Sequence, residues 1–286
     1  MVTPAEPTPI QSGPTDLFVP GPHGPVPLRV FWGEGRRALL WCHGGAFAHG
    51  DIDMPEAAWT ARRLVELTGL TVVTPDYRLA TEVATPARWP VRWPVPSDDV
   101  VAAWAWLSER SGDVAPEGLL LGGASAGANL ATGALLRVLG SGGDLVAPQA
   151  LLLAYPTLHA VQPAPSAELA ALLAQLPEQE RWGPAEVLSM YRDLLGPEQV
   201  EDPPLAAVPG HAVAADLAGF PRTLVLLSEV DGLRPSGEAF ARTLAQAGVD
   251  VRVHLEPGTS HGHLNQPDHP GAERSLAAVA QWVASA

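Results

Sequence analysis

One serine lies in a short glycine-bounded segment that could carry nucleophilic chemistry. Residues 123–127 read GASAG, follow the apolar run Leu119-Leu120-Leu121, and precede a stretch that predicts a helix. A strand, a tight turn bearing Ser125 and a helix make a nucleophile elbow, where a Cβ at either flanking glycine would collide with the neighbouring strand or helix. Five residues alone fit an ordinary glycine-rich turn equally well, so the hypothesis needs partners for Ser125.

Two further residues supply the partners that such a serine requires. Serine is a weak nucleophile at neutral pH, and it needs a neutral imidazole as base and a carboxylate to orient that imidazole. Ser125, Asp231 and His261 occur in the order Ser, Asp, His, which is the order of α/β-hydrolases and not of the two best-known serine protease folds.

A second glycine-containing loop could bind the negative charge that forms during acyl transfer. Backbone N–H groups of Gly44, Gly45 and Ala46 can point at a tetrahedral oxyanion together with the N–H of Ala126, and glycine permits the close approach. We therefore expect these four residues to form an oxyanion hole.

Each assignment has rivals. Glu229 is a second acid near Asp231, but it lies nearer the strand, whereas Asp231 precedes Gly232 and suits a loop. His263 and His269 compete with His261 for the role of base.

A metal site is the less favoured explanation of these histidines. His261 and His263 are close neighbours, yet no carboxylate or cysteine accompanies them at ligand spacing. His43, which precedes a glycine turn, is interpreted as structural. The single cysteine, Cys42, ends an apolar run and is expected to be a buried, inert thiol. We expect neither a metal nor another cofactor.

Strand and helix patterns alternate along most of the chain, which predicts an α/β fold with a largely parallel sheet. The loops that hold His43, Ser125, Asp231 and His261 each follow a predicted strand, and the carboxyl ends of parallel strands share one edge of a sheet. Strands are predicted over 28–32, 38–42, 70–75, 119–121, 150–155, 222–227 and 249–255, and helices over 55–67, 130–137, 237–247, 272–283 and from Ser97, as the cap, to residue 110.

The chain is long enough for one large domain. Its 286 residues predict a single α/β domain, 1–286, with a loosely ordered start over about 1–15. Residues 157–205 interrupt the alternation with two short helical patterns, 167–175 and 184–195, between proline-rich joints. An insertion of this kind above the strand ends is a candidate lid.

Charge and hydropathy restrict the partners. The formal net charge of −14 disfavours nucleic acid and anionic membranes, and a small neutral substrate fits better than an anion. No stretch approaches the roughly 18 apolar residues that span a bilayer, and no signal peptide is recognised, so a cytoplasmic protein is expected. A homodimer is among the assemblies expected.

Taken together, these motifs make the chain similar to the hormone-sensitive lipase family (bacterial family IV) of esterases within the α/β-hydrolases. The resemblance runs from about residue 28 to the C-terminus and is carried by HGGAF at 43–47, DYRLA at 76–80, GASAG at 123–127, DGLR at 231–234 and HG at 261–262. It implies that Ser125 is the nucleophile, His261 the general acid and base, Asp231 its orienting partner, and the residues named above the oxyanion donors.

The chain departs from the family pattern at a few positions. Ala124 stands where the family usually carries Asp, Ala128 where Gly is common, and His263 where an aromatic residue is usual. Only 42 residues precede His43, so the N-terminal helical part of the lid is expected to be reduced. The resemblance implies a serine carboxylesterase for short-chain acyl esters. An amidase, formamidase or lactonase with the same residues, or a ligand-binding relative without turnover, are the alternatives.

Overall fold

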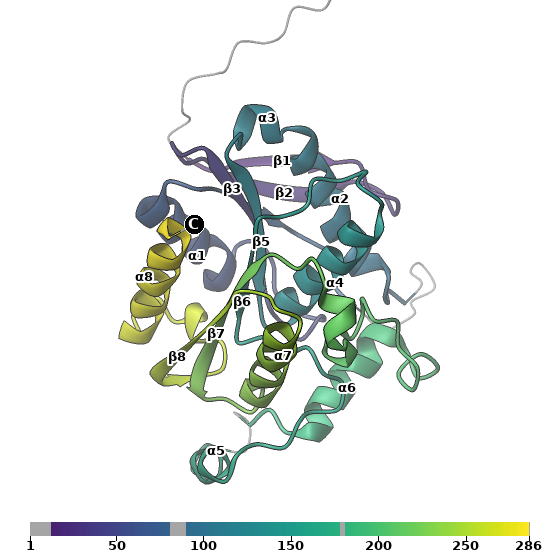
Figure 1. Cartoon of the computed structure of the whole chain (residues 1–286), viewed down its shortest axis with the longest axis vertical. Helices are drawn as coiled ribbons and strands as arrows, with labels where there is room; N and C mark the ends of the chain where they lie inside the picture. The colour runs from purple at the N-terminus through teal and green to yellow at the C-terminus, as the bar shows by residue number, and fades with distance from the viewer. Residues whose placement is uncertain (1–12, 81–89, 178–180, 286) are drawn as a thin grey trace, which may run out of the picture.

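A central eight-stranded sheet organises the molecule (Figure 1). The computed structural model describes residues 13–80, 90–177 and 181–285. The strand order is β1-β2-β4-β3-β5-β6-β7-β8, with β1 and β2 joined antiparallel to the sheet and all other pairs parallel. The strands are β1 Thr15–Val19, β2 Val26–Phe31, β3 Arg37–Cys42, β4 Thr71–Pro75, β5 Gly118–Ala124, β6 Ala150–Ala154, β7 Arg222–Val230 and β8 Val251–Ser260.

The central strands are buried along almost their whole length, because helices cover both faces of the sheet. Every residue of β4 and β6 is buried, and β3 and β5 are buried except for the first residue of each. Continuous apolar runs of this kind are typical of parallel strands that pack on two sides. The sequence patterns at 38–42, 70–75, 119–121 and 150–155 therefore predicted these strands correctly.

The helices form two layers, one on each face of the sheet. Figure 1 shows α1 and α8 on one side and α2, α4 and α7 on the other, and the buried apolar side chains form two matching clusters. No helix within the described ranges is both long and apolar enough to cross a membrane. The helices are α1 Pro55–Thr68, α2 Val95–Glu109, α3 Ser111–Val114, α4 Ala126–Gly140, α5 Ala167–Leu173, α6 Pro184–Leu195, α7 Arg234–Gln246 and α8 Pro270–Ala284, with short 3₁₀ turns η2 Pro209–His211, η3 Ala214–Leu217 and η4 His263–Asn265.

Helix α2 begins earlier than the sequence predicted. Helix α2 begins at Val95, so Ser97 lies inside the helix and does not cap it; its buried Oγ instead accepts a hydrogen bond from Arg137. Of the segment 1–15 that we expected to be loosely ordered, residues 1–12 lie outside the described ranges, and Thr15 already belongs to strand β1.

Helices α5 and α6 both come from the stretch 157–205, and they differ in how they attach. Helix α6 buries Val187, Met190, Tyr191, Leu194 and Leu195 against the core. Helix α5 buries only Leu169 and lies at the lower edge of the view in Figure 1. Helix α6 is thus anchored by apolar packing, whereas helix α5 is largely exposed.

Candidate active site

Ser125 sits on a sharp turn between β5 and α4. Its backbone has φ 51° and ψ −117°, a left-handed conformation that costs energy for a residue with a Cβ and is found mostly at functional sites. An ideal Cβ at Gly123 would lie 2.5 Å from the carbonyl carbon of Gly127, and one at Gly127 would lie 2.2 Å from the carbonyl oxygen of His43. Both flanking positions therefore require glycine, and the turn is an elbow as predicted.

The structure brings the three residues Ser125, His261 and Asp231 into one hydrogen-bonded line. The Oγ of Ser125 lies 3.0 Å from Nε2 of His261, and Nδ1 of His261 lies 2.8 Å from Oδ2 of Asp231. An ionised carboxylate can only accept, so Nδ1 of His261 carries the proton and Nε2 is free to accept from the serine hydroxyl. The carboxylate of Asp231 is fully buried and its Oδ1 also accepts from the N–H of Leu233.

Electrostatics favour a basic imidazole at His261. Burial lowers the pKa of His261, but the buried carboxylate of Asp231, through its charge and its hydrogen bond, and the charge of Glu56 outweigh that effect. The pKa of His261 is therefore raised above its usual 6.5.

The rival acid and the rival histidines have other partners. Glu229 is still part of β7, and its carboxylate accepts from the N–H of Gly258 at 2.8 Å. His269 caps helix α8 by accepting from the N–H of Gly271. His263 makes hydrogen bonds with the hydroxyls of two serines, so it does not share a ligand site with His261.

The loop after β3 reaches the serine turn, and one of its expected donors is already used. The N–H of Gly44 donates to Oε2 of Glu56 at 2.5 Å, so in this structure, contrary to the expectation, Gly44 does not offer a free donor to an oxyanion. The next residues, Gly45, Ala46 and Phe47, have φ values of 115°, 52° and 64°, which turn the chain tightly. Between described residues, no backbone hydrogen bond uses the N–H of Gly45 or Ala46.

Ala126 begins helix α4 directly after the serine. The first four N–H groups of a helix have no intrahelical acceptor, and the helix dipole places partial positive charge at this end. The N–H of Ala126 is therefore free to donate to an anion beside Ser125. The N–H groups of Gly45 and Ala46, in the loop after β3, are free to donate to the same anion.

Comparison with known proteins agrees with this geometry. A family described as the alpha/beta hydrolase fold matches residues 39–265. The chain is 30% identical to esterase LipI of Mycobacterium tuberculosis over 87% of this chain and 74% of that protein, and 32% identical to an ethyl acetate hydrolase of Pseudomonas putida over 79% and 66%. The crystal structure of EstE1, a carboxylesterase cloned from a metagenomic library, superposes with a TM-score of 0.80 at 29% identity, covering 96% of this chain and 89% of that one.

The chain is an α/β-hydrolase. Its resemblance to the hormone-sensitive lipase family is confirmed, and the chain is a carboxylic ester hydrolase. From here on we refer to it as the hydrolase.

Trp182, from the stretch between α5 and α6 of the hydrolase, lies beside His261. Its ring is edge-on to that of His261, with centroids 5.5 Å apart. An ideal Cβ at Gly232 would lie 2.1 Å from the carbonyl oxygen of Trp182, so the glycine after Asp231 lets this segment pass close to the site. The apolar ring of Trp182 forms one wall next to the imidazole.

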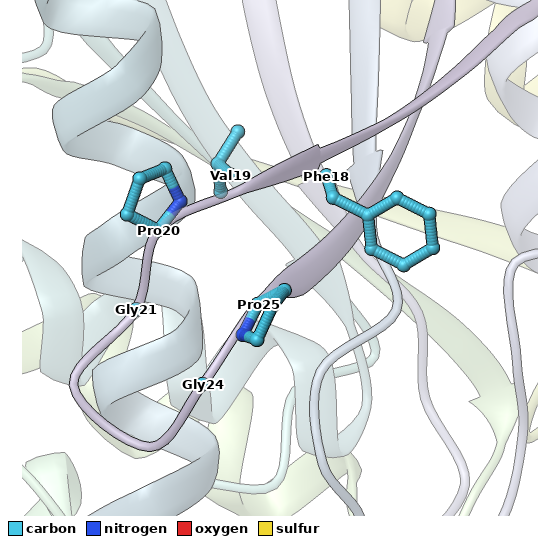
Figure 2. Close-up of a pocket in the computed structure, with 6 residues that line it drawn as sticks. All are labelled: Phe18, Val19, Pro20, Gly21, Gly24 and Pro25. Carbon is cyan, nitrogen blue, oxygen red and sulfur yellow. The ribbon is translucent and has the colours of Figure 1, made fainter.

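The hydrolase also has a surface hollow that is remote from this chemistry (Figure 2). It lies at the turn between β1 and β2 on the opposite, antiparallel side of the sheet, and it contains no titratable or nucleophilic side chain. The side chains that line it are all apolar, so it offers no chemistry for ester cleavage. The lining residues are Phe18, Val19, Pro20, Gly21, Gly24 and Pro25.

Sequence reasoning missed two residues of the hydrolase that contact the site. Glu56 receives the Gly44 N–H, and Tyr155, just after β6, packs edge-on against His261 with ring centroids 5.2 Å apart. The signal for Glu56 was present, because Glu56, Thr60 and Leu64 recur at helical spacing and form one buried stripe of α1. A charged residue on the buried face of a helix indicates that another segment of the chain supplies its hydrogen-bond donors or its counter-charge.

Proposed function

We propose that the hydrolase cleaves short-chain acyl esters through an acyl-enzyme on Ser125. The observation that carries this proposal is the line of hydrogen bonds from Ser125 Oγ to His261 Nε2 and from His261 Nδ1 to Asp231 Oδ2, at 3.0 and 2.8 Å. Nucleophile, base and orienting carboxylate are all present in the geometry that acyl transfer requires.

In the proposed reaction, the Ser125 oxygen attacks the ester carbonyl carbon while its proton moves to Nε2 of His261. The carbonyl oxygen becomes an oxyanion, which accepts hydrogen bonds from the N–H groups of Gly45, Ala46 and Ala126. Collapse breaks the bond to the alcohol oxygen, which takes the proton from His261. Water then attacks the acyl-serine by the same path and releases the acid and free Ser125.

The preference for short acyl chains rests on the surroundings of His261. The ring of Trp182 stands next to the imidazole and limits the space on that side. A relative at 32% identity is named an ethyl acetate hydrolase, which acts on an ester with a two-carbon acyl group. Both observations favour a small, neutral ester.

The same proposal includes a single domain over 1–286 with a cover formed by residues 157–205. Helix α6 holds this cover to the core through Tyr191, whose hydroxyl accepts from the amide of Asn129 and donates to the carbonyl of Thr157 at the start of the cover. Asn129 is four residues beyond Ser125 on α4, so the cover is fastened to the helix that carries the nucleophile.

The test is release of p-nitrophenol from acetyl, butyryl, octanoyl and palmitoyl esters. We expect kcat/KM to fall as the chain lengthens, and Ser125→Ala to lose at least ~10³-fold in kcat, because the acyl-enzyme can no longer form. Ser141→Ala, at the far end of α4, is the matched control and should retain wild-type turnover.

Other outcomes would redirect the proposal. Turnover of an anilide or lactone without turnover of any ester would replace the ester with that substrate class. Undiminished ester turnover in a folded Ser125→Ala variant would overturn the acyl-enzyme on Ser125. A folded wild type that turns over none of these substrates would favour a ligand-binding relative.

A further inference from the structure

A buried carboxylate on α1 links the two loops that flank Ser125. Glu56 is only 1% exposed, and its side chain accepts three hydrogen bonds. Oε2 accepts from the N–H of Gly44 at 2.5 Å, and Oε1 accepts from the hydroxyl of Tyr155 at 2.6 Å and from the amide nitrogen of Asn265 at 3.1 Å. Gly44 begins the loop with the oxyanion donors, and Asn265 lies four residues beyond His261.

The surroundings of Glu56 fit the ionised carboxylate. The N–H of Gly44 can only donate. The backbone N–H of Glu56 donates to Oδ1 of Asn265 at 3.1 Å, which fixes the orientation of that amide and turns its NH₂ group toward the carboxylate. Burial is the largest influence and raises the pKa of Glu56 above its usual value, although the hydrogen bonds from Tyr155, Gly44 and Asn265 and the charge of His261 each favour the negative form. The N–H of Gly44 and the NH₂ group of Asn265 can only donate, and the Tyr155 hydroxyl completes the set by donating to the same carboxylate.

Tyr155 connects this carboxylate to the imidazole. Its ring is edge-on to both His261 and His263, each with centroids 5.2 Å away. Its backbone is held at φ 34°, an unfavourable conformation for a residue with a bulky side chain. Its N–H donates to the carbonyl of Leu226, and its hydroxyl is anchored on Glu56, so this strained position is fixed at both ends.

We propose that Glu56 is a positioning residue for ester hydrolysis, which sets the oxyanion loop and the His261 loop relative to one another through Gly44, Tyr155 and Asn265. This inference rests on the proposed function. The oxyanion donors in the loop after β3 and the base His261 approach Ser125 from different loops. A shift of about 1 Å between the donors and the base can lower the rate ~10²-fold. Because oxyanion donors act mainly in the transition state, loss of this role lowers kcat more than it raises KM.

The negative charge of Glu56 also acts on His261. The charged or titratable groups that face this imidazole are Asp231 from the loop after β7, Glu56 from α1, Tyr155 from the end of β6 and His263 from η4. Asp231 and Glu56 both favour the protonated imidazole. Removal of the Glu56 charge should therefore move the acid limb of the pH profile to lower pH, an effect that altered packing alone does not produce.

The experiment compares Glu56→Gln with Glu56→Asp, using p-nitrophenyl acetate. Glutamine keeps the volume but must turn its NH₂ group toward the N–H of Gly44 or toward the NH₂ group of Asn265, so that two donors face each other in either orientation. We expect kcat of Glu56→Gln to fall ~10- to 100-fold with KM within about threefold, together with the acid shift of the pH profile. Aspartate keeps the negative charge on a shorter side chain. The acid side of the pH profile of Glu56→Asp should therefore lie closer to that of wild type, and its kcat should be intermediate between those of wild type and Glu56→Gln.

The matched control is Glu256→Gln, at a second buried glutamate. Glu256 is 2% exposed, lies on β8, and pairs with Arg274 at 2.6 Å and with His254 at 3.1 Å, away from the oxyanion loop. This variant also loses a buried carboxylate, so it should lower the melting temperature while kcat stays within twofold of wild type.

Tyr155→Phe keeps the inference testable if Glu56→Gln does not fold. It removes the hydroxyl and retains the ring against both histidines, and we expect a three- to tenfold loss in kcat. A folded Glu56→Gln or Tyr155→Phe with kcat within twofold of wild type overturns the positioning role alone, provided that wild type is active and Ser125→Ala is not. An inactive wild type overturns the proposed function and the positioning role with it.

Discussion

Two small clusters contact the Tyr155 ring, and each places an imidazole between two oxygen-bearing partners. In the first cluster, His261 lies between Ser125 and Asp231. In the second, His263 lies between the hydroxyls of Ser228 and Ser275, at 2.9 and 2.8 Å. Both imidazole rings are edge-on to Tyr155 with centroids 5.2 Å apart. The two histidines are thus alike in sequence position, ring contact and number of partners.

The partner at Nδ1 separates the two clusters. The Asp231 carboxylate raises the pKa of His261 despite its burial, whereas His263 has a neutral hydroxyl at the same nitrogen, and burial lowers its pKa to about 4. A neutral histidine can satisfy one hydroxyl by donating and the other by accepting, without any charge. A single carboxylate thus distinguishes a base from a structural crosslink in otherwise similar surroundings.

The largest expected effect comes from removing that carboxylate. Asp231→Asn should lower kcat/KM for p-nitrophenyl acetate by about 10⁴-fold, because the amide favours the wrong tautomer of His261 and cannot stabilise the imidazolium. The fold should be retained, since Asn keeps the volume and can still accept from the N–H of Leu233.

Glu229→Gln is the matched control for this prediction. Glu229 lies two residues from Asp231, and its carboxylate contacts the N–H of Gly258 rather than an imidazole. Its kcat/KM should stay within a few-fold of wild type. A large loss in Glu229→Gln with little loss in Asp231→Asn would show that the orienting acid had been assigned to the wrong carboxylate.

The fold could be predicted where local sequence determines it. Buried parallel strands such as β4 and β6 leave apolar runs that need no knowledge of the rest of the chain. Strand β1 was not predicted, because five residues at the edge of a sheet with exposed Asp16 and Phe18 have no distinctive pattern of their own. Its conformation depends on pairing with β2, which is a contact between segments.

The candidate site could be predicted in part for a similar reason. Ser125 and Gly45 follow strand ends, and parallel strands place those ends at one edge, so their proximity follows from the topology. The use of the Gly44 N–H by Glu56 could not be foreseen, because it depends on how far α1 lies from the loop. The sequence likewise does not reveal which of two neighbouring histidines, His261 or His263, contacts the carboxylate of Asp231.

The next largest effect should be on the free energy of unfolding, and it comes from the cluster of His263, Ser228 and Ser275. The pKa of His263 is about 4 in the folded state and about 6.5 in the unfolded chain, so the unfolded state binds the extra proton first. The contribution of His263 is fully present above pH 6.5 and is lost as the pH falls toward 4. We expect the free energy of unfolding to decrease by about 3 kcal/mol from this residue between pH 7 and pH 4.

His263→Phe isolates that contribution, since an aromatic residue fills the space without titrating. Urea unfolding of both proteins at pH 8, where the imidazole is neutral in either state, measures the cost of the lost hydrogen bonds to Ser228 and Ser275. The further difference at lower pH belongs to protonation, and the variant should lose less stability than wild type on acidification. Equal losses in the two proteins would contradict a neutral, buried His263.

The smallest expected effect concerns the pH at which the rate of the wild-type hydrolase falls on acidification. His261 must be neutral to accept the Ser125 proton, so kcat/KM falls when the pH drops below its pKa in the free enzyme. Because Asp231 and Glu56 raise that pKa, the half-maximal rate should lie above pH 6.5 when p-nitrophenyl acetate hydrolysis is followed from pH 5 to 9 at constant ionic strength. A flat profile over this range would contradict a base with a raised pKa at His261, because the limb of a base with the pKa of His263, about 4, lies below pH 5.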